Sequence, residues 1–495
     1  MAYGIQVTGP AGNETINLSM LGGRSFVQEI VTDWVPPGGQ TYEYTFPNIP
    51  SGNDLVIYPA SAGPFYWETA TVNGQAVLRL HANTPTGNVG SGSSQSILLV
   101  FARKTVESFN NDYGVALVND AGERTVSAIY PTAEYLGKLD FNPIHDSWLQ
   151  GGDAIISFSP YHLYTHTCTS TNIGAGRTRI ILWSLPDTAS DIWYSCSTSY
   201  IPSRYASSDY FQIDIQVVTS QGKGYAIPEA YVFAVDNIST SADSYGLRVY
   251  DASGKCTFDG GLNHMVINSY KSEMAYYVYD FYDRVANNIG GGTIIRPNPG
   301  GPANEYVIDS FTGITPLIAL PTYIAEEGLP DASLYSLSSS IYTHTGMIRK
   351  SGNSLFLRSL ITSVSLEDAQ LSQGYYWEYG AWNNIGTVIV DGTPYGGTTL
   401  STADLVVSGH FNAVISPSQT FDVSWTCSGA GATYLSWYLE DVYQSDLPLV
   451  GSGSIGPLAS KTTIYNYTPP YNVVVVAKTA SGKVVAQASF QFYVS

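Results

Sequence analysis

The segment Tyr245-Gly246-Leu247-Arg248-Val249-Tyr250-Asp251-Ala252-Ser253-Gly254-Lys255 carries the pattern that decides the fold. The pattern occurs three times, beginning at Tyr3, Tyr113 and Tyr245. Each copy has a Tyr-Gly pair, apolar residues two and four positions after the tyrosine, Gly nine positions after it and Thr twelve positions after it. A fixed spacing of this kind indicates a repeated β module.

The four residues that end at the shared glycine have the composition of a type I turn. They place Asn or Asp first in two copies and Pro second in the remaining one. A glycine at the end of such a turn can adopt positive φ and form the bulge that matches the twist of the two strands. We therefore predict an antiparallel hairpin in each copy, with positive φ at Gly12, Gly122 and Gly254. The apolar residues share one strand face, so each hairpin needs a second layer to cover it.

Composition supports an all-β fold. The 495 residues include 48 Gly, 26 Pro and 38 Tyr, only 12% are charged, and few stretches have helical periodicity with capping signals. The hairpins divide the chain into β modules at 1–108, 109–240 and 241–403, followed by a different module at 404–495. We expect tandem modules resembling β-sandwiches. Two short strings also recur, Val-Phe-Ala ending at residues 102 and 234, and Tyr-Thr-His-Thr at 164–167 and 342–345.

The last module, 404–495, has an immunoglobulin-like pattern. Residues 420–427 alternate as a sandwich strand would, and Trp437 fits a core tryptophan on the next strand. Residues 472–477 and 483–494 predict a terminal hairpin around Thr479-Ala480-Ser481-Gly482. No cysteine follows Cys427, so the disulfide of antibody domains is absent and a sandwich without a bridge is expected.

Charge and cysteine content exclude several functions. The formal net charge is −19 and no segment offers the basic stripe that nucleic-acid or anionic-membrane binding requires. The four cysteines are scattered without a CxxC pair, which indicates reduced thiols in a protein that folds in a cytosol. The sequence opens without a basic and apolar leader, and no run of about 18 apolar residues occurs. We expect neither a signal peptide nor membrane insertion.

One histidine cluster suggests a metal site. His162, His166 and Cys168 share a strand face by parity, but about 3.3 Å per residue separates positions 162 and 166 by about 13 Å, too far for both to bind one ion. No metal or other cofactor is predicted. The remaining histidines are isolated and are expected to be surface or packing residues: His81, His145, His264, His344 and His410.

Paired carboxylates of a glycosidase would have to flank a groove about 5 to 10 Å apart. The candidates are generic, and on a strand Asp280 and Asp283 would face opposite sides. The others are Glu68, Glu367, Asp368 and Glu378. No nucleophile, phosphate-binding or zinc motif stands in a supporting context, so no catalytic residue is assigned. Exposed Tyr and Trp would suit sugar rings or protein interfaces, whereas the alternative is that they fill sandwich cores.

The opening Met-x-Tyr-Gly, the repeated segment 245–255, the missing leader and the immunoglobulin-like end together resemble structural proteins of tailed-bacteriophage virions, in particular tail-associated proteins. The resemblance covers about a quarter of the chain and implies assembly into a virion, at the tail or its fibres. It supplies no catalytic residue.

The residues and the resemblance predict a non-enzymatic virion protein that is made in the host cytoplasm and located in the tail. Its expected partners are other tail proteins and copies of itself, with a host surface glycan or receptor as a further partner. The alternatives are a capsid decoration protein and a tail enzyme that binds or depolymerises polysaccharide. A depolymerase with a parallel β-helix would show regular rungs of about 20 residues, which the sequence lacks.

Overall fold

The structure is a computed structural model of the chain. Its described residues contain antiparallel β-sheets, two single-turn 3-10 helices, η1 (Gly52–Asp54) and η2 (Thr393–Tyr395), and no α-helix, which confirms the all-β prediction. The described residues are 6–8, 14–17, 25–32, 41–59, 65–82, 96–103, 116–118, 124–127, 130–139, 161–169, 177–188, 192–201, 210–220, 222–236, 238–242, 247–278, 293–295, 306–319, 324–330, 339–367, 381–409, 414–440, 442–461 and 471–494.

The three predicted hairpins are present and share one register. In each, the residue four positions after the tyrosine pairs with the residue thirteen positions after it, as in Val7↔Ile16, Leu117↔Val126 and Val249↔Phe258. A β-bulge follows at the same place in all three. The strands are β1 (Gln6–Thr8) with β2 (Glu14–Asn17), β9 (Ala116–Val118) with β10 (Arg124–Ser127), and β17 (Arg248–Tyr250) with β18 (Cys256–Asp259).

The third hairpin also confirms the predicted turn. Gly254 has φ +83° and donates its N–H to the carbonyl of Asp251, while the N–H of Asp251 bonds the carbonyl of Lys255. The Asp251 carboxylate accepts from the N–H groups of Ser253 and Lys255, which fixes the turn from inside. Gly12 and Gly122 lie outside the described residues, so positive φ at these two positions stays a prediction.

Each hairpin is followed by six strands with the same order. In residues 25–102 the first, sixth and third strands form one sheet, β3-β8-β5, and the second, fifth and fourth form the other, β4-β7-β6. All neighbouring strands are antiparallel. The strands are β3 (Ser25–Thr32), β4 (Thr41–Phe46), β5 (Leu55–Pro59), β6 (Phe65–Val72), β7 (Gln75–Ala82) and β8 (Ser96–Ala102).

The same order returns in residues 134–234, as sheets β11-β16-β13 and β12-β15-β14. It returns again in 267–391, as β19-β26-β22 and β21-β25-β24, with β20 and β23 added at the margins. We call these ranges the first (25–102), second (134–234) and third (267–391) units. The boundaries expected at residues 108 and 240 fall between them.

The second unit contains β11 (Glu134–Leu139), β12 (Tyr161–Thr169), β13 (Arg179–Ser184), β14 (Trp193–Ile201), β15 (Tyr210–Ser220) and β16 (Glu229–Ala234). The third unit contains β19 (Ile267–Val278), β20 (Thr293–Ile295), β21 (Tyr306–Ser310), β22 (Pro316–Ala319), β23 (Ile324–Pro330), β24 (Ser339–Ser351), β25 (Ser354–Glu367) and β26 (Ala381–Asp391).

The second and third units join through like edges. Strand β13 pairs antiparallel with its counterpart β22 at Trp183↔Ile318, and β14 pairs with its counterpart β24 at Tyr194↔Ile348. Both sheets therefore continue from one unit into the other, giving two seven-stranded sheets. Antiparallel contact between identical edges is the geometry of an isologous dimer, here within one chain.

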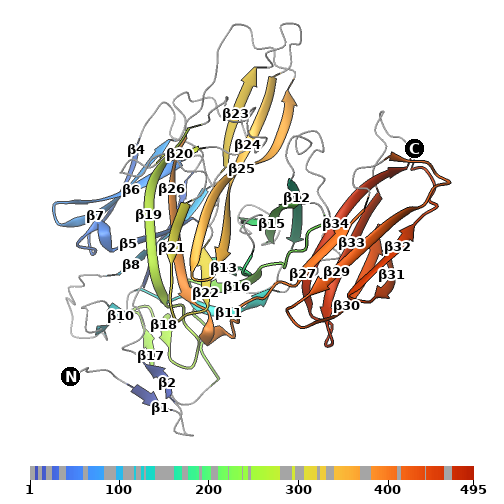
Figure 1. Cartoon of the computed structure of the whole chain (residues 1–495). Coiled ribbons are helices and arrows are strands. Elements are labelled where there is room, and N and C mark those ends of the chain that lie inside the picture. Colours follow the sequence, from blue (N-terminus) through green and yellow to red (C-terminus); the bar gives the residue numbers. More distant parts are fainter. Residues whose placement is uncertain are drawn as a thin grey trace.

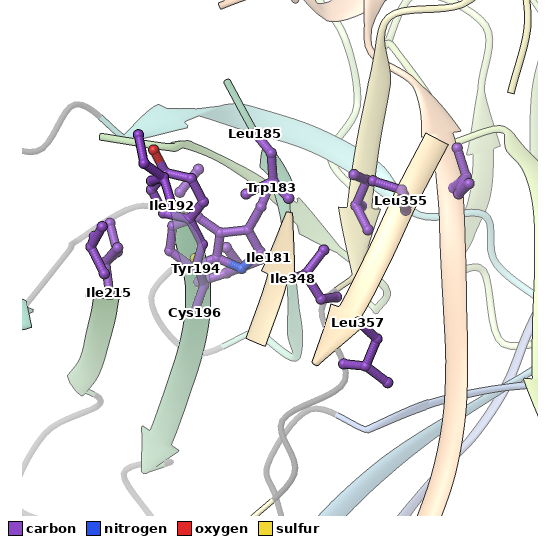
Figure 2. Close-up of a cluster of buried hydrophobic side chains, with 14 of the residues drawn as sticks. Ile181, Trp183, Leu185, Ile192, Tyr194, Cys196, Ile215, Ile348, Leu355 and Leu357 are labelled. Carbon is purple, nitrogen blue, oxygen red and sulfur yellow. The ribbon is translucent and has the colours of Figure 1, made fainter. Parts of the chain in front are cut away.

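The three units form four layers of sheet with three cores between them. Figure 1 shows the first unit, in blue, beside β19 and β26 of the third. The two seven-stranded sheets enclose one core, which includes Trp183 and Tyr194 (Figure 2). The opposite face of the sheet that contains β16 packs on β3-β8-β5 of the first unit, with Phe233 and Phe101 in that core. The third core lies between β3-β8-β5 and β4-β7-β6. Because the sheet is covered on both faces at β13 and β16, these two strands are buried along almost their whole length.

Residues 404–494 form two packed sheets, β27-β29-β32 and β28-β34-β33-β30-β31. Strand β29 alternates buried and exposed residues as predicted, and Trp437 on β30 packs against the core. The predicted terminal hairpin is confirmed, with Gly482 at φ +82°. The strands are β27 (Asp404–Ser408), β28 (Val414–Ile415), β29 (Phe421–Ser428), β30 (Ala432–Leu439), β31 (Val442–Leu447), β32 (Val450–Ile455), β33 (Tyr471–Thr479) and β34 (Val484–Val494).

Candidate functional site

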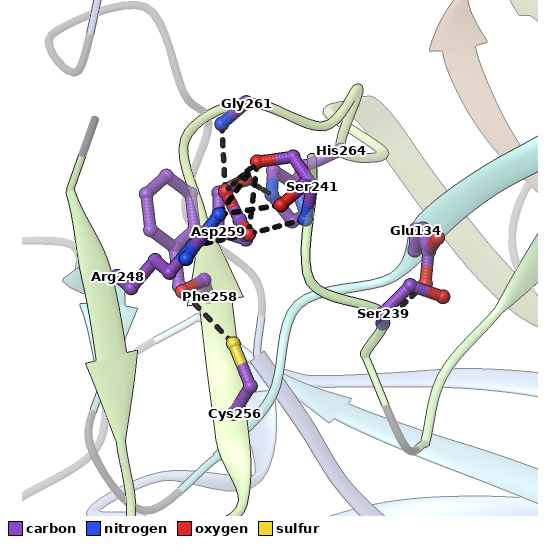
Figure 3. A network of polar contacts seen from close by, with 9 residues as sticks. All are labelled: Glu134, Ser239, Ser241, Arg248, Cys256, Phe258, Asp259, Gly261 and His264. Carbon is purple, nitrogen blue, oxygen red and sulfur yellow. Dashed lines mark hydrogen bonds and ion pairs between the residues drawn. The ribbon is translucent and has the colours of Figure 1, made fainter. Parts of the chain in front are cut away.

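A buried carboxylate on β18 is the centre of a polar network (Figure 3). The Asp259 carboxylate accepts hydrogen bonds from the N–H of Ser241 at 2.7 Å, the N–H of Gly261 at 2.9 Å and Nε of Arg248 at 2.8 Å. The hydroxyl of Ser241 donates to it as well, at 3.0 Å. The network fixes the loop before the third hairpin to both of its strands.

Electrostatics keep this carboxylate ionised. Burial acts to raise the pKa of Asp259, but the hydrogen bonds from Gly261, Ser241 and Arg248 outweigh burial and lower the pKa. Its oxygens are already occupied by donors. Asp259 is therefore a structural anchor and is not placed to take a proton from a substrate.

The imidazole of His264 lies beside this network without forming a catalytic triad. Its Nε2 donates to the backbone carbonyl of Asp259 at 2.7 Å, and its Nδ1 lies 2.8 Å from the hydroxyl of Thr132. The ring stacks on Phe258, and burial lowers its pKa, which favours the neutral form. A triad needs the serine hydroxyl on the imidazole and a carboxylate oxygen behind it, whereas Ser241 bonds the carboxylate directly.

A second network connects the third hairpin to the start of the second unit. Glu134 forms an ion pair with Arg177 at 2.6 Å and accepts the N–H of Ser239 at 2.9 Å. The N–H of Thr132 bonds the carbonyl of Thr257, the threonine shared by all three hairpins. These contacts hold units together, which assigns both networks to assembly of the fold.

A half-exposed charged cluster lies on the outer face of β4-β7-β6. Arg79 binds Glu43 at 2.9 Å and Glu68 at 3.4 Å, and His81 lies 3.4 Å from Glu68 while stacking on Tyr66. Glu68 is the one carboxylate candidate from the sequence whose side chain is described. Arg79 bridges it to Glu43, so the cluster is an ion-pair network of one guanidinium and two carboxylates on a sheet face.

The C-terminal sandwich docks on the second unit through residues 222–225. Gly224 donates its N–H to Leu405 on β27, and Tyr225 exchanges two backbone hydrogen bonds with Gln487 on β34. The side chains of Tyr225 and Gln487, both fully buried, also bond each other at 2.8 Å. A side chain at Gly224 would collide with Leu405, since an added Cβ would lie 2.6 Å from the leucine Cβ. The sandwich is thus fixed to the second unit. We call the three units together the body.

The sequence analysis did not predict these networks or this docking segment. One feature of the sequence could have indicated the Asp259 network. The residue fourteen positions after each shared tyrosine is polar, as Asn17, Ser127 and Asp259. No comparable pattern marks residues 222–225, because their partners are distant in the sequence.

The predicted histidine cluster lies on strand β12, whose register with β15 is uninterrupted. Positions 162, 166 and 168 are thus spaced along a regular strand, as the distance argument assumes. In the described ranges, no group of three or more His, Cys, Asp and Glu could hold a metal ion. Other candidates lie outside the described residues: His145, Asp280, Asp283, Asp368, Glu378 and His410.

Glu367 and His344 lie on β25 and β24, far along a long strand pair, and no role is assigned to them. Three cysteines, Cys196, Cys256 and Cys427, are free and buried. Burial raises the pKa of each thiol, most strongly for Cys196 inside the core between the seven-stranded sheets. They behave as small apolar residues.

No protein-family model and no curated protein matches the chain. In the part of the chain that the structure describes, no helix has the length and hydrophobicity of a membrane span.

Proposed function

We propose that this chain is a structural component of a tailed-phage virion, in the tail, tail tip or fibre, where it takes part in assembly and host attachment. The observation that carries the proposal is the repetition of one hairpin-and-six-strand unit three times, with two units joined edge to edge and the first packed on their shared sheet. A protein built in this way offers large, rigid surfaces, which suit a scaffold that works by contact.

We further propose that residues 404–495 form an immunoglobulin-like domain. Support comes from the two sheet orders, the parallel pairing of β28 with β34, and Trp437 on the strand after the one that carries Cys427. Fixed to the body by residues 222–225, this domain is presented in one orientation. A surface held rigidly in many copies can bind firmly through weak contacts.

Gold-labelled antibody to the chain, imaged on purified virions of the phage that encodes it, tests the location. Labelling at the tail is expected. Labelling at the head would favour the capsid decoration alternative, and unlabelled particles would remove the structural proposal. Antibody adsorbed with the purified chain serves as the control.

The enzymatic alternative has its own test. Purified protein incubated with host capsule or lipopolysaccharide is expected to release no new reducing ends. Release that is lost in variants with Asp280, Asp283, Glu367 or Glu378 neutralised would establish a depolymerase instead.

A further inference from the structure

The two sheets of the C-terminal sandwich have four edge strands. Two of these are protected from pairing with a further strand, one by being covered and the other by being very short. The edge of β27 is covered by the second unit, because Gly224 donates to Leu405 and Val407 donates to Gly222. Strand β28, at the margin of the other sheet, is only two residues long. Covered edges and very short edge strands are two ways in which proteins avoid unwanted strand pairing.

The edge of β31 is closed by two further devices. A β-bulge at Gln444 interrupts its register with β30, which twists the edge away from a flat template. The side-chain amide of Gln444 also donates to the carbonyl of Val442 at 2.9 Å, so it occupies one acceptor of the edge strand.

Strand β32 lacks all of these features. Its sequence, Val450-Gly451-Ser452-Gly453-Ser454-Ile455, contains no charge and no proline, and its register with β29 is uninterrupted. Within the described residues β32 pairs with β29 alone, and Val450 is 66% exposed. Figure 1 shows β32 on the side of the sandwich that faces away from the body. A regular, uncharged, exposed edge is a template for strand addition.

We propose that β32 pairs antiparallel with β32 of a second copy of this chain. The chain itself joins its second and third units in this way, with identical edges in antiparallel contact at β13–β22 and β14–β24. The residues of β32 themselves add no charge to the repulsion between two chains of net charge −19. The pairing would unite two sandwiches across a two-fold axis.

Light scattering of the full chain during size-exclusion chromatography tests this proposal. We expect the wild type to run at twice the chain mass at micromolar concentration. The double variant Val450→Lys/Ser452→Lys should run at the chain mass, because the outward lysines of both copies would face each other across the new pair. At least a tenfold rise in the dimer dissociation constant is expected.

The matched control is Val414→Lys/Ser416→Lys. It adds the same charges at the same spacing in the same sandwich, at a valine that is 67% exposed on β28, an edge strand of the other sheet, so it should remain dimeric. Hydrogen exchange provides a second readout: amides of residues 450–455 should become more protected as wild-type concentration rises. A wild type that stays monomeric, or a dimer that survives the β32 substitutions, overturns the proposal.

This inference adds a self-association surface to the proposed virion role and is tested on the purified chain. If the chain is absent from virions, the proposed function is wrong, whereas the dimer measurement still decides whether β32 pairs with a second copy. Conversely, a monomeric chain found on the tail would remove only the β32 pairing.

Discussion

The first and second units have the same strand order but join the rest of the molecule differently. The second unit meets the third edge to edge, whereas the first lays one sheet face on the seven-stranded sheet. Strand β13 of the second unit and its counterpart β5 of the first are both buried almost throughout, whereas β4, in the outer sheet of the first unit, is mostly exposed and carries Glu43. The residues outside a unit's own core, on its edge strands and outer sheet faces, therefore decide how that unit contacts its neighbours.

The largest expected effect breaks the face-to-face joint. Phe233→Ala removes a fully buried ring from the core shared by the first unit and the seven-stranded sheet. Loss of transfer free energy and the cavity left behind should cost about 3 to 5 kcal/mol. Calorimetry should show the main thermal transition at a lower temperature.

Thr45→Ala on the open sheet of the first unit is the control. Thr45 is exposed, so its replacement should change stability by no more than about 0.5 kcal/mol. Equal effects of the two substitutions would mean that the two sheets do not differ in burial as described.

The second prediction concerns the contact between the second unit and the C-terminal sandwich, which residues 222–225 form. Gly224→Val should push β27 away, because the new side chain would overlap Leu405. Several buried hydrogen bonds of about 1 kcal/mol each would weaken together. Small-angle scattering should show a larger radius of gyration, and amides of residues 485–489 should exchange faster.

Gly313→Ala is suited to the control for that experiment. Gly313 has positive φ and open space around an added Cβ, so the change strains only its own turn. An unchanged radius in Gly224→Val would show that residues 222–225 do not hold the sandwich in place.

Local signals predicted the hairpins, the all-β class and the alternation of β29, because turn composition and strand periodicity act between near neighbours. Short sequence strings that recur did not predict which strands occupy equivalent places in different units. The two Tyr-Thr-His-Thr strings lie on β12 and β24, the second strand of one unit and the fourth of another. A strand's place in a sheet is set by partners far along the chain, and a four-residue string carries no record of them.

The polar networks were hidden for the same reason. Asp259 is stabilised by Ser241 and Arg248 nearby, but His264 reaches Thr132, which is 132 residues away. The docking contact between Tyr225 and Gln487 spans 262 residues. Such contacts become visible only after the strand order is known.

A smaller effect is expected at two turns that have the same chemistry in different regions. Gly254 and Gly482 have φ of +83° and +82°, and neither has an atom within 4 Å of an added Cβ. Valine at either position should therefore cost about 1 to 3 kcal/mol through backbone strain alone. Thermal denaturation of both variants should give similar losses, and a loss near zero at one of them would separate the two turns.

The smallest expected effect is on the pH dependence of stability. It separates the buried His264, beside Asp259, from the half-exposed His81 of the first unit. Burial lowers the pKa of His264 in the folded state, so the unfolded chain binds the proton more readily. The stability that depends on the neutral imidazole is complete above the unfolded pKa of about 6.5 and declines as pH falls below it, by at most about 1.4 kcal/mol per pH unit. The lowered pKa of Asp259 acts in the same direction, but only below about pH 4. Melting temperatures between pH 7 and 5 should therefore fall less steeply in His264→Gln than in the wild type. His81→Gln, at the half-exposed cluster of the first unit, provides the comparison, and parallel pH profiles for wild type and His264→Gln would show that the buried imidazole is not the titrating group.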